Sequence, residues 1–190
     1  MECKIGLFDA HIGGPHQLFK IGQALPNDID IICGDCFDFA NVDKDYIERL
    51  TLHYTMVKAK YGNRYTEGNH ECSHWEHFHY QWEAPSGRIC ASSHGHLTWD
   101  KKKIRKWQNK EDGAGSIKRG FSYLLNRYRD TFGGFKITDD ELDRAFEYMN
   151  RQGFHMMALG HKHPLELKVF TEGDMELRFY PRGIHPVYYE

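Results

Sequence analysis

A chain of 190 residues fits a single domain and is long enough to bury a hydrophobic core without disulfide support. Its 25 Lys and Arg nearly balance 27 Asp and Glu, and the net charge of -2 does not indicate a nucleic-acid or anionic-membrane partner. We expect a cytoplasmic protein without a membrane span, because no apolar run approaches about 20 residues, the amino terminus lacks a signal-peptide pattern and the five cysteines show no disulfide spacing.

Short apolar runs that end in loops predict the strands of the first half of the chain, at 3–8, 29–33, 64–66 and 88–92. Helical spacing of apolar residues predicts a short helix at 15–25 and a longer one at 43–61, which Gly62 ends. A stretch rich in histidine and aromatic residues follows at 73–82. This succession of strands and helices indicates an α/β fold.

A charged, helical segment occupies residues 97–152 and interrupts this pattern. Helices are expected within it at 98–109, 116–130 and 138–152, and Thr138 with Glu141 forms a capping box for the last of them. Beyond it we expect a strand at 154–159, a β-hairpin from 165–171 and 175–180, and a short edge strand at 187–189. The sequence therefore predicts one domain, 1–190, with a helical insertion at about 97–152.

Side chains that commonly bind metals follow each early strand, and the chain holds 13 histidines in all. The carboxyl ends of strands in an α/β sheet converge on one edge, so five loops would bring these side chains together. Their residues are Asp9, His11, Asp35, Asn69, His70, His94, His161 and His163. The set is too large for one tetrahedral ion and suits two ions that share a carboxylate, roughly 3.5–4 Å apart. Mixed imidazole and carboxylate donors favour manganese, iron, zinc, nickel or cobalt over magnesium and calcium.

Five ordered blocks of sequence resemble the calcineurin-like metallophosphoesterase superfamily over about four-fifths of the chain. They are Asp9-x-His11, Gly34-Asp35-x-x-Asp38, Gly68-Asn69-His70-Glu71, His94 and Gly160-His161-x-His163. The resemblance implies a four-layer α/β/β/α sandwich with a helical cap insertion. It also implies a binuclear metal-dependent phosphoesterase that hydrolyses a phosphodiester or phosphomonoester by attack of a hydroxide generated at the metal ions.

The family resemblance implies a role for each of these residues. One ion would be held by Asp9, His11 and His163, and a second by Asn69, His94 and His161. Asp35 would bridge the ions, His70 would stabilise or protonate the leaving group, and Asp38 would orient ligands from behind. Two divalent transition-metal ions are expected, with Mn²⁺ the first choice.

The architecture is most similar to the UDP-2,3-diacylglucosamine pyrophosphohydrolase branch, in which a helical insertion at this place caps the active site. Two departures separate the chain from that branch, which typically has Arg at the position of His70 and a further Arg directly after the last histidine, where this chain has Pro164. We therefore take the architecture from this branch without its lipid substrate. The expected partner is a phosphorylated small molecule or a nucleotide.

The basic insertion leaves alternatives open. The run at 101–106 could be a solvated helical face, or it could attract nucleic acid with Trp107 as a stacking platform, as in a nuclease or cyclic-nucleotide phosphodiesterase. His96 lies close to the site in sequence and could contact substrate. A third hypothesis, from a different class, is a metal-binding scaffold that has lost catalysis.

Two further clusters have both a functional and a structural interpretation. The residues from His74 to Trp82 could form a third metal site, line the substrate cleft with His74, or make up a half-buried helix face, which we favour. Cys33 and Cys36 form a C-x-x-C pattern, but they flank a candidate ligand instead of opening a helix. We therefore expect buried or loop thiols there, with no redox or zinc role.

Overall fold

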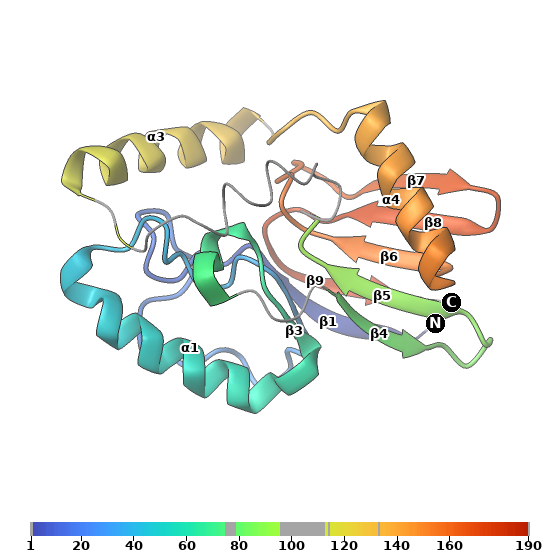
Figure 1. The fold of residues 1–190 in the computed structure, drawn as a ribbon, viewed down its shortest axis with the longest axis horizontal. Coiled ribbons are helices and arrows are strands. Elements are labelled where there is room, and N and C mark those ends of the chain that lie inside the picture. Colours follow the sequence, from blue (N-terminus) through green and yellow to red (C-terminus); the bar gives the residue numbers. More distant parts are fainter. Residues whose placement is uncertain (1, 75–78, 96–112, 114, 133, 190) are drawn as a thin grey trace.

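The computed structural model describes residues 2–74, 79–95, 113, 115–132 and 134–189. Two β-sheets lie face to face, with α1 (Ile47–Tyr61) covering one and α4 (Asp139–Gln152) covering the other (Figure 1). The four-layer α/β/β/α architecture expected from the sequence is confirmed. Within the described part of the chain, no helix combines the length and hydrophobicity needed to cross a membrane.

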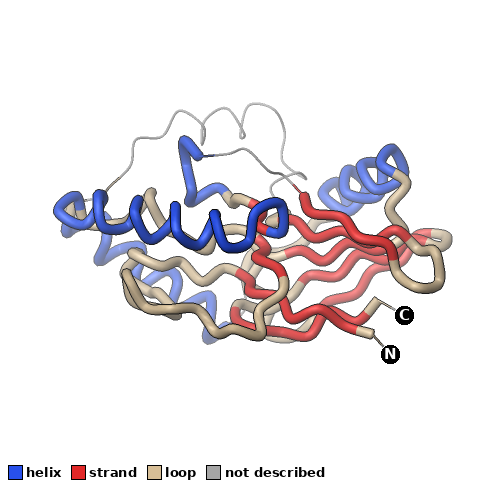
Figure 2. Tube along the Cα trace, turned by 90° about the horizontal axis from the view of Figure 1, so that it is seen from below, coloured by secondary structure: helices blue, strands red, loops and turns tan. Residues whose placement is uncertain are grey.

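The first sheet has the strand order β3 (Tyr65–Thr66), β2 (Ile31–Cys33), β1 (Cys3–Phe8) and β9 (Gly183–Tyr188). The three strands from the first half of the chain are parallel, whereas β9 runs antiparallel to β1. All six residues of β9 pair with β1, so this strand is longer than the 187–189 segment that we expected. The pairing places both ends of the chain side by side (Figure 2).

The second sheet has the order β4 (His79–Glu83), β5 (Ile89–Ser93), β6 (Met156–Leu159), β8 (Met175–Phe179) and β7 (Lys168–Glu172). Its three central strands are parallel and its two edge strands antiparallel. The expected strand after the insertion and the expected hairpin are both present, as β6 and as β7 with β8. The carboxyl ends of β5 and β6 therefore point the same way.

Three apolar layers hold the sheets and helices together. Neighbouring residues of a strand serve different layers: Leu7 packs toward α1 while Phe8 lies between the sheets, and Met156 lies between the sheets while Met157 packs toward α4. Side chains of a strand alternate between its two faces, and here both faces are buried. This explains why the core strands read as short continuous apolar runs.

The prediction of a short helix at 15–25 was wrong, because the structure has turns there. Gly22 adopts a positive φ of 82°, and its N–H donates to Nδ1 of His53 on α1 instead of to a helical carbonyl. Leu25 is nevertheless buried in the core, so the apolar spacing reflected contact with α1 and not helix formation. The helix expected at 43–61 is present, as a 3₁₀ turn, Lys44–Tyr46, that leads into α1.

The stretch from His74 to Trp82 was also interpreted wrongly where it can be compared, because strand β4 begins at His79. Tyr80 and Trp82 pack between the sheets, whereas His79 contacts Tyr148 and Phe154 on the α4 side. This alternation fits a strand and not a helix face. A 3₁₀ turn, Gly62–Arg64, precedes β3, and a second 3₁₀ segment, Asn69–His74, follows it. His74 is the last residue of that second segment.

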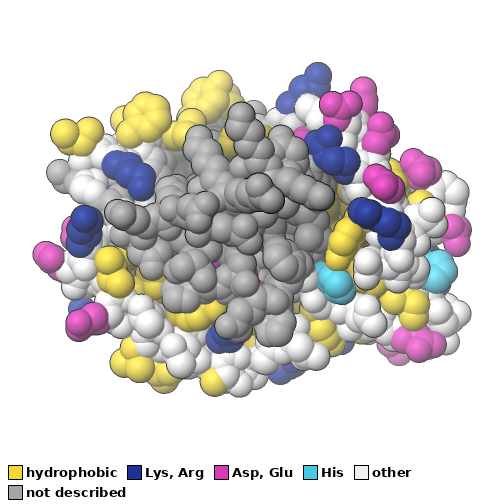
Figure 3. Space-filling model, in the orientation of Figure 1, with side chains coloured by type: hydrophobic (Ala, Val, Ile, Leu, Met, Phe, Trp, Pro, Cys, Tyr) yellow, Lys and Arg dark blue, Asp and Glu magenta, His cyan; other side chains and the backbone are white. Residues whose placement is uncertain are grey.

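The two described helices of the insertion, α3 and α4, differ in how they pack on the rest of the protein. The helix expected at 98–109 lies outside the described residues, as do His96 and Trp107. Helix α4, with the expected capping box, packs on the second sheet as one of the four layers. Helix α3 (Ser116–Phe132) lies apart from that layer and exposes a hydrophobic stripe at the edge of the molecule (Figures 1 and 3). The stripe consists of Ile117, Phe121, Leu124, Tyr128 and Phe132. The 97–152 boundary itself stays a prediction.

Candidate metal centre

The carboxyl ends of five strands, from both sheets, deliver the candidate metal ligands to one buried place. Strands β1, β2 and β3 of the first sheet lead to Asp9 with His11, to Asp35 and to Asn69. Strands β5 and β6 of the second sheet lead to the others, His94, His161 and His163. All seven side chains are buried. Topology therefore explains how residues more than 150 positions apart become neighbours.

Backbone hydrogen bonds extend the pairing of β1 and β2 into the loops that follow them. The N–H groups of Asp9, His11 and Ile12 donate to the carbonyls of Gly34, Asp35 and Cys36, at 3.3, 2.8 and 2.8 Å. This ladder holds the Asp9–His11 loop in register with Asp35. The two loops consequently act as one rigid part of the site.

Left-handed backbone conformations are concentrated at the candidate ligands. Five non-glycine residues with positive φ occur in the described chain, and all five belong to the proposed ligand set: Asp9, His11, Asp35, His161 and His163. Such conformations cost roughly 1–2 kcal/mol per residue relative to the right-handed form. Strain of this kind persists where surrounding structure enforces it, typically at functional sites.

Glycines beside the ligands allow the loops to approach closely. A Cβ at Gly34 would overlap the side chain of His94, and one at Gly68 would overlap Asp35. At Gly160 a Cβ would lie 2.6 Å from Oδ2 of Asp9. These three positions exclude any larger residue, because the side chain of a ligand already occupies the space.

Donor atoms gather in three overlapping groups whose members all lie within 4.8 Å of one another. The groups are Asp9–His11–His163, Asp35–His94–His161 and His11–Asp35–His70. The first two match the sets expected for two ions, apart from Asn69. The third shows that His70, expected to act without binding metal, is also near enough to be a ligand.

The donors fit divalent metal ions on two further observations. Nε2 of His11 and Oδ1 of Asn69 are buried and form no hydrogen bond with any described residue. Burying such atoms without a partner is costly, and both atoms can coordinate a cation. In addition, Nε2 of His94 lies 3.0 Å from Oδ1 of Asp9 and 3.1 Å from Oδ2 of Asp35, so two buried carboxylates meet at one point.

The electrostatics of the site keep both carboxylates ionised. Burial alone would raise the pKa of Asp9, but the charge of His163 and a hydrogen bond from His94 outweigh it and lower that pKa. The pKa of Asp35 is lowered against the same burial by His94 and His70. Conversely, the two carboxylates raise the pKa of His94 although burial opposes this, while burial lowers the pKa of His11. A positive charge is therefore favoured between Asp9 and Asp35.

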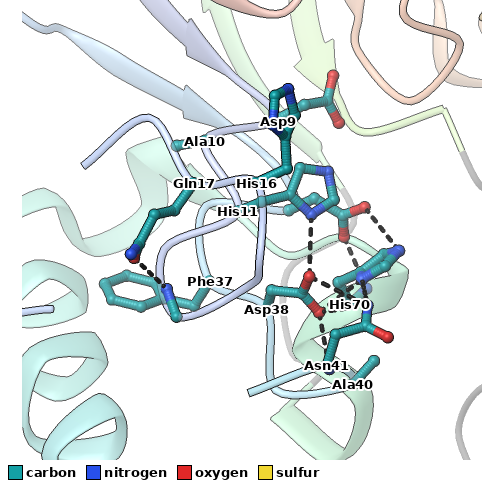
Figure 4. A network of polar contacts seen from close by, with 12 residues as sticks. Asp9, Ala10, His11, His16, Gln17, Phe37, Asp38, Ala40, Asn41 and His70 are labelled. Carbon is teal, nitrogen blue, oxygen red and sulfur yellow. Dashed lines mark hydrogen bonds and ion pairs between the residues drawn. The ribbon is translucent and has the colours of Figure 1, made fainter. Parts of the chain in front are cut away.

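His70 is oriented by a network from the Asp38 loop (Figure 4). Oδ1 of Asp38 lies 2.7 Å from Nδ1 of His70, and Asn41 donates from its side chain to both oxygens of Asp38. Asp38 also lies 3.5 Å from His11, at Nδ1. The N–H of His70 donates to Asp35 at 2.7 Å, while its Nε2 lies 4.0 Å from Oδ2 of the same residue.

Glu71, for which no separate role was expected, supports the loops that carry the candidate ligands. Its carboxylate accepts hydrogen bonds from the N–H groups of Asp35, Phe37 and Gly68 and from the hydroxyl of Tyr65, the last at 2.6 Å. Burial and the charge of Asp35 raise the pKa of Glu71, and these donors offset part of the shift. One carboxylate thus ties the loops after β2 and β3 together.

Replacing Tyr65 by Phe should therefore destabilise the protein by about 1–3 kcal/mol, because the buried Glu71 carboxylate loses a donor. Urea unfolding of the metal-free variant measures the change. Tyr46→Phe is the matched control, because Tyr46 is exposed in the 3₁₀ turn before α1. This replacement should change stability little. Equal stability of Tyr65→Phe and the wild type would show that the hydroxyl is dispensable to this network.

The segment between α3 and α4 packs on the His161–His163 loop and forms a hydrogen bond with it. The N–H of Phe135 donates to the carbonyl of Lys162 at 2.9 Å, and the Phe135 ring stacks on His161 with centroids 6.0 Å apart. Nζ of Lys162 forms a buried ion pair with Glu141 of α4 at 2.7 Å. At the other end of α3, Lys118 donates to the Ala40 carbonyl and Arg119 pairs with Asp43. Helix α3 is thereby connected to loops on two sides of the site.

Arg182, which sequence reasoning missed, braces the Asp9 loop. Its guanidinium donates to the carbonyls of Asp9, Ala10 and His16. It also lines a hollow of about 260 Å³ beside His163, together with Leu18, Pro164, Leu165 and Pro181. No local signal marks Arg182, because its contacts span more than 160 positions of sequence.

Several other sequence candidates are not brought into the described site. His74 is placed by its backbone only, and His96 and Trp107 lie outside the described residues. Cys33 packs between the sheets and Cys36 on the α1 side, both as free thiols. Burial raises the pKa of both cysteines. The absence of a redox or zinc role stays a prediction.

Comparisons with known proteins give remote structural likenesses only. No family model matches the sequence, and no curated protein matches it. A conserved uncharacterized protein from Streptococcus pneumoniae, described as a predicted phosphoesterase, is 15% identical with a TM-score of 0.40, over 96% of this chain and 74% of that one. Vacuolar protein sorting 29 from Cryptosporidium parvum is 13% identical with a TM-score of 0.40, over 95% and 75%. These likenesses are too remote to assign a family.

Proposed function

We propose that this chain is a metal-dependent phosphoesterase of the calcineurin-like metallophosphoesterase superfamily. One observation carries the proposal: two groups of buried donors, Asp9–His11–His163 and Asp35–His94–His161, lie next to each other and meet at His94. Adjacent groups of this composition suit a pair of divalent transition-metal ions, with Mn²⁺ as the first expectation and iron, zinc, nickel or cobalt as alternatives.

The residues divide between the ions as the family resemblance implies. Asp9, His11 and His163 would hold one ion, Asn69, His94 and His161 the other, and Asp35 would be shared. When bound, two such ions polarise a phosphoryl group and make water a better nucleophile at neutral pH. Asp38 and Glu71 support these ligands through the contacts described above, so they would set the geometry of the ligands without touching the substrate.

His70 would assist departure of the leaving group. Asp38 can only accept a hydrogen bond, so Nδ1 of His70 donates to it, and Nε2 is left on the side of Asp35. A proton held at Nε2 can pass to the oxygen that leaves phosphorus, which is general acid catalysis. Hydrolysis of a phosphodiester would then yield a phosphomonoester and an alcohol.

The substrate would be a phosphorylated small molecule or a nucleotide. The hollow beside His163 is close to the small end of ligand cavities and is bordered by apolar side chains and Arg182, which suits a compact organic group next to the reacting phosphate. Lys118 and Arg119, two of the basic residues that suggested nucleic acid, are engaged with Ala40 and Asp43. A nuclease therefore remains the second candidate, and likeness to the UDP-2,3-diacylglucosamine pyrophosphohydrolase branch remains an expectation about architecture.

The test is hydrolysis of bis-p-nitrophenyl phosphate and p-nitrophenyl phosphate by metal-stripped protein reloaded with Mn²⁺. Activity should disappear with EDTA and return with Mn²⁺. His70→Gln should lower kcat by about 10²–10⁴-fold while the number of bound Mn²⁺ ions, measured by calorimetry, stays the same. His155→Gln, at the opposite end of β6, is the matched control and should retain activity.

Other outcomes would identify the alternatives. Protein that binds Mn²⁺ but hydrolyses neither ester, with the His70→Gln variant equally inert, would be a metal-binding scaffold. Loss of bound Mn²⁺ in His70→Gln would make His70 a ligand, as its group with His11 and Asp35 allows. Cleavage of single-stranded RNA or DNA, with binding that weakens as salt rises, would favour the nuclease.

A further inference from the structure

A second cavity, of about 360 Å³, lies between α1 and the turns at 20–27, and no residue of the metal centre lines it. Its floor and walls are mainly apolar and include Ile21, Leu25, Leu52, Met56 and Val57. The hollow exists where the helix expected at 15–25 is replaced by turns. Its volume falls within the range of small-molecule binding sites.

One face of α1 forms the long side of this cavity. Arg49, Leu52, Met56 and Lys60 follow one another at intervals of three and four residues, so they share that face. The side chains of Leu52 and Met56 are 64% and 63% exposed. Two large apolar side chains exposed next to each other at the mouth of a cavity are characteristic of a binding surface.

The charged groups of the cavity have one sign. Its described lining residues include the cations Arg49 and Lys60 but no Asp or Glu. The cationic groups of Arg49 and Lys60 lie over the aromatic rings of Tyr46 and Tyr61, and neither forms an ion pair with a carboxylate of the described residues. An anionic group would therefore be attracted to the cavity and a cationic group repelled.

The two cations mark opposite ends, because eleven residues of helix span about 16 Å. The Lys60 end is the better anion site. Nζ of Lys60 and Cζ of Arg64 lie 5.3 and 5.6 Å from the centroid of the Tyr61 ring. The Tyr61 hydroxyl is buried, lacks a hydrogen-bond partner among described residues and belongs to a side chain that lines the cavity. Burial is the main cause that raises the pKa of Tyr61, and the charges of Asp28 and Asp30 add to it. Neither of these two carboxylates lines the cavity.

We infer that this cavity binds a small amphipathic monocarboxylate, with its carboxylate at Lys60 and the Tyr61 hydroxyl and its hydrocarbon chain along Val57, Met56 and Leu52. Since one water occupies about 30 Å³ in the liquid, the cavity holds about a dozen non-hydrogen atoms. A carboxylate of about eight to ten carbons matches that number. The ligand is a free soluble molecule, and its binding does not require metal.

The first experiment titrates metal-free protein, labelled at its methionine methyl groups, with octanoate, 1-octanol and octyltrimethylammonium. Octanoate should shift the methyl signal of Met56 and leave that of Met149, a buried residue of α4, unchanged. Octanoate should bind at least about tenfold more tightly than octanol, because a hydrogen-bonded charge pair is worth that factor or more. The cation should bind weakest.

Matched variants locate the site. Leu52→Glu places a negative charge at the exposed mouth and should abolish binding, whereas Leu124→Glu on α3, equally exposed at 65%, should not. Lys60→Gln should weaken octanoate about tenfold, and Arg49→Gln should weaken it less. Tyr61→Phe should reduce affinity for octanoate but not for octanol.

The inference would be overturned if millimolar octanoate left Met56 unshifted, if Leu52→Glu bound it as well as Leu124→Glu does, or if octanol bound as tightly as octanoate. It would also fail if the shifts disappeared in His163→Asn but persisted in Leu52→Glu, because the carboxylate would then occupy the metal centre. Phosphoesterase activity does not enter any of these readouts, so this inference and the proposed function can fail separately.

Discussion

Replacing Asp35 by Asn should reduce hydrolysis of bis-p-nitrophenyl phosphate by more than about 100-fold, since changing a residue that merely supports a metal ligand commonly costs 10–100-fold. Asp35 belongs to two of the three donor groups, and its Oδ2 lies 3.1 Å from Nε2 of His94. Asn keeps the shape of the side chain and tolerates the φ of 43° at this position. The loss should therefore reflect a missing charge and not a misfolded loop.

Thermal unfolding gives a second readout of the same variant. Mn²⁺ at 100 times its Kd should stabilise the wild type by about 2.7 kcal/mol, which corresponds to about 5–10 °C in Tm for a chain of this size. The shift should be much smaller in Asp35→Asn and unchanged in the control Asp28→Asn, whose side chain is exposed. An undiminished shift in Asp35→Asn would show that Asp35 does not hold metal.

Gly34→Ala should lower the free energy of unfolding by about 2–5 kcal/mol. Two costs combine: a left-handed conformation, at φ 74°, and an overlap of the new Cβ with the His94 side chain. The first costs about 1–2 kcal/mol and the second about 1–3 kcal/mol. Since Gly34 adjoins Asp35 and the overlap displaces His94, metal affinity should fall as well.

Gly87→Ala separates the two costs. Gly87 lies in the turn between β4 and β5 with a φ of 83°, and a Cβ there would have no atom within 4 Å. Its replacement should therefore cost only the conformational part, about 1–2 kcal/mol. Urea unfolding of both metal-free variants gives the comparison. Equal losses would show that the His94 side chain moves aside without cost, which would contradict the close packing inferred for this loop.

The sequence located the candidate ligands because each lies directly after a strand, and the ends of parallel strands converge by topology alone. It misassigned 15–25 because the apolar spacing of Ile21 and Leu25 resembles a helix, whereas the Gly22 bond to His53 depends on a helix 31 positions away. It missed β4 because alternation there uses aromatic and histidine side chains on both faces. Arg182 and the pair Glu141–Lys162 could not be predicted for the same reason as the Gly22 bond, since their contacts join segments that lie far apart in the sequence.

The five left-handed residues have a consequence for how this chain could evolve. At Asp9, His11, Asp35, His161 and His163, glycine or asparagine would relieve the backbone at each position. Selection for stability alone would accept those replacements. A descendant of this chain that was released from binding metal should therefore drift toward Gly and Asn at these five positions before its core changes, and the order of such losses would record when the requirement for metal ended.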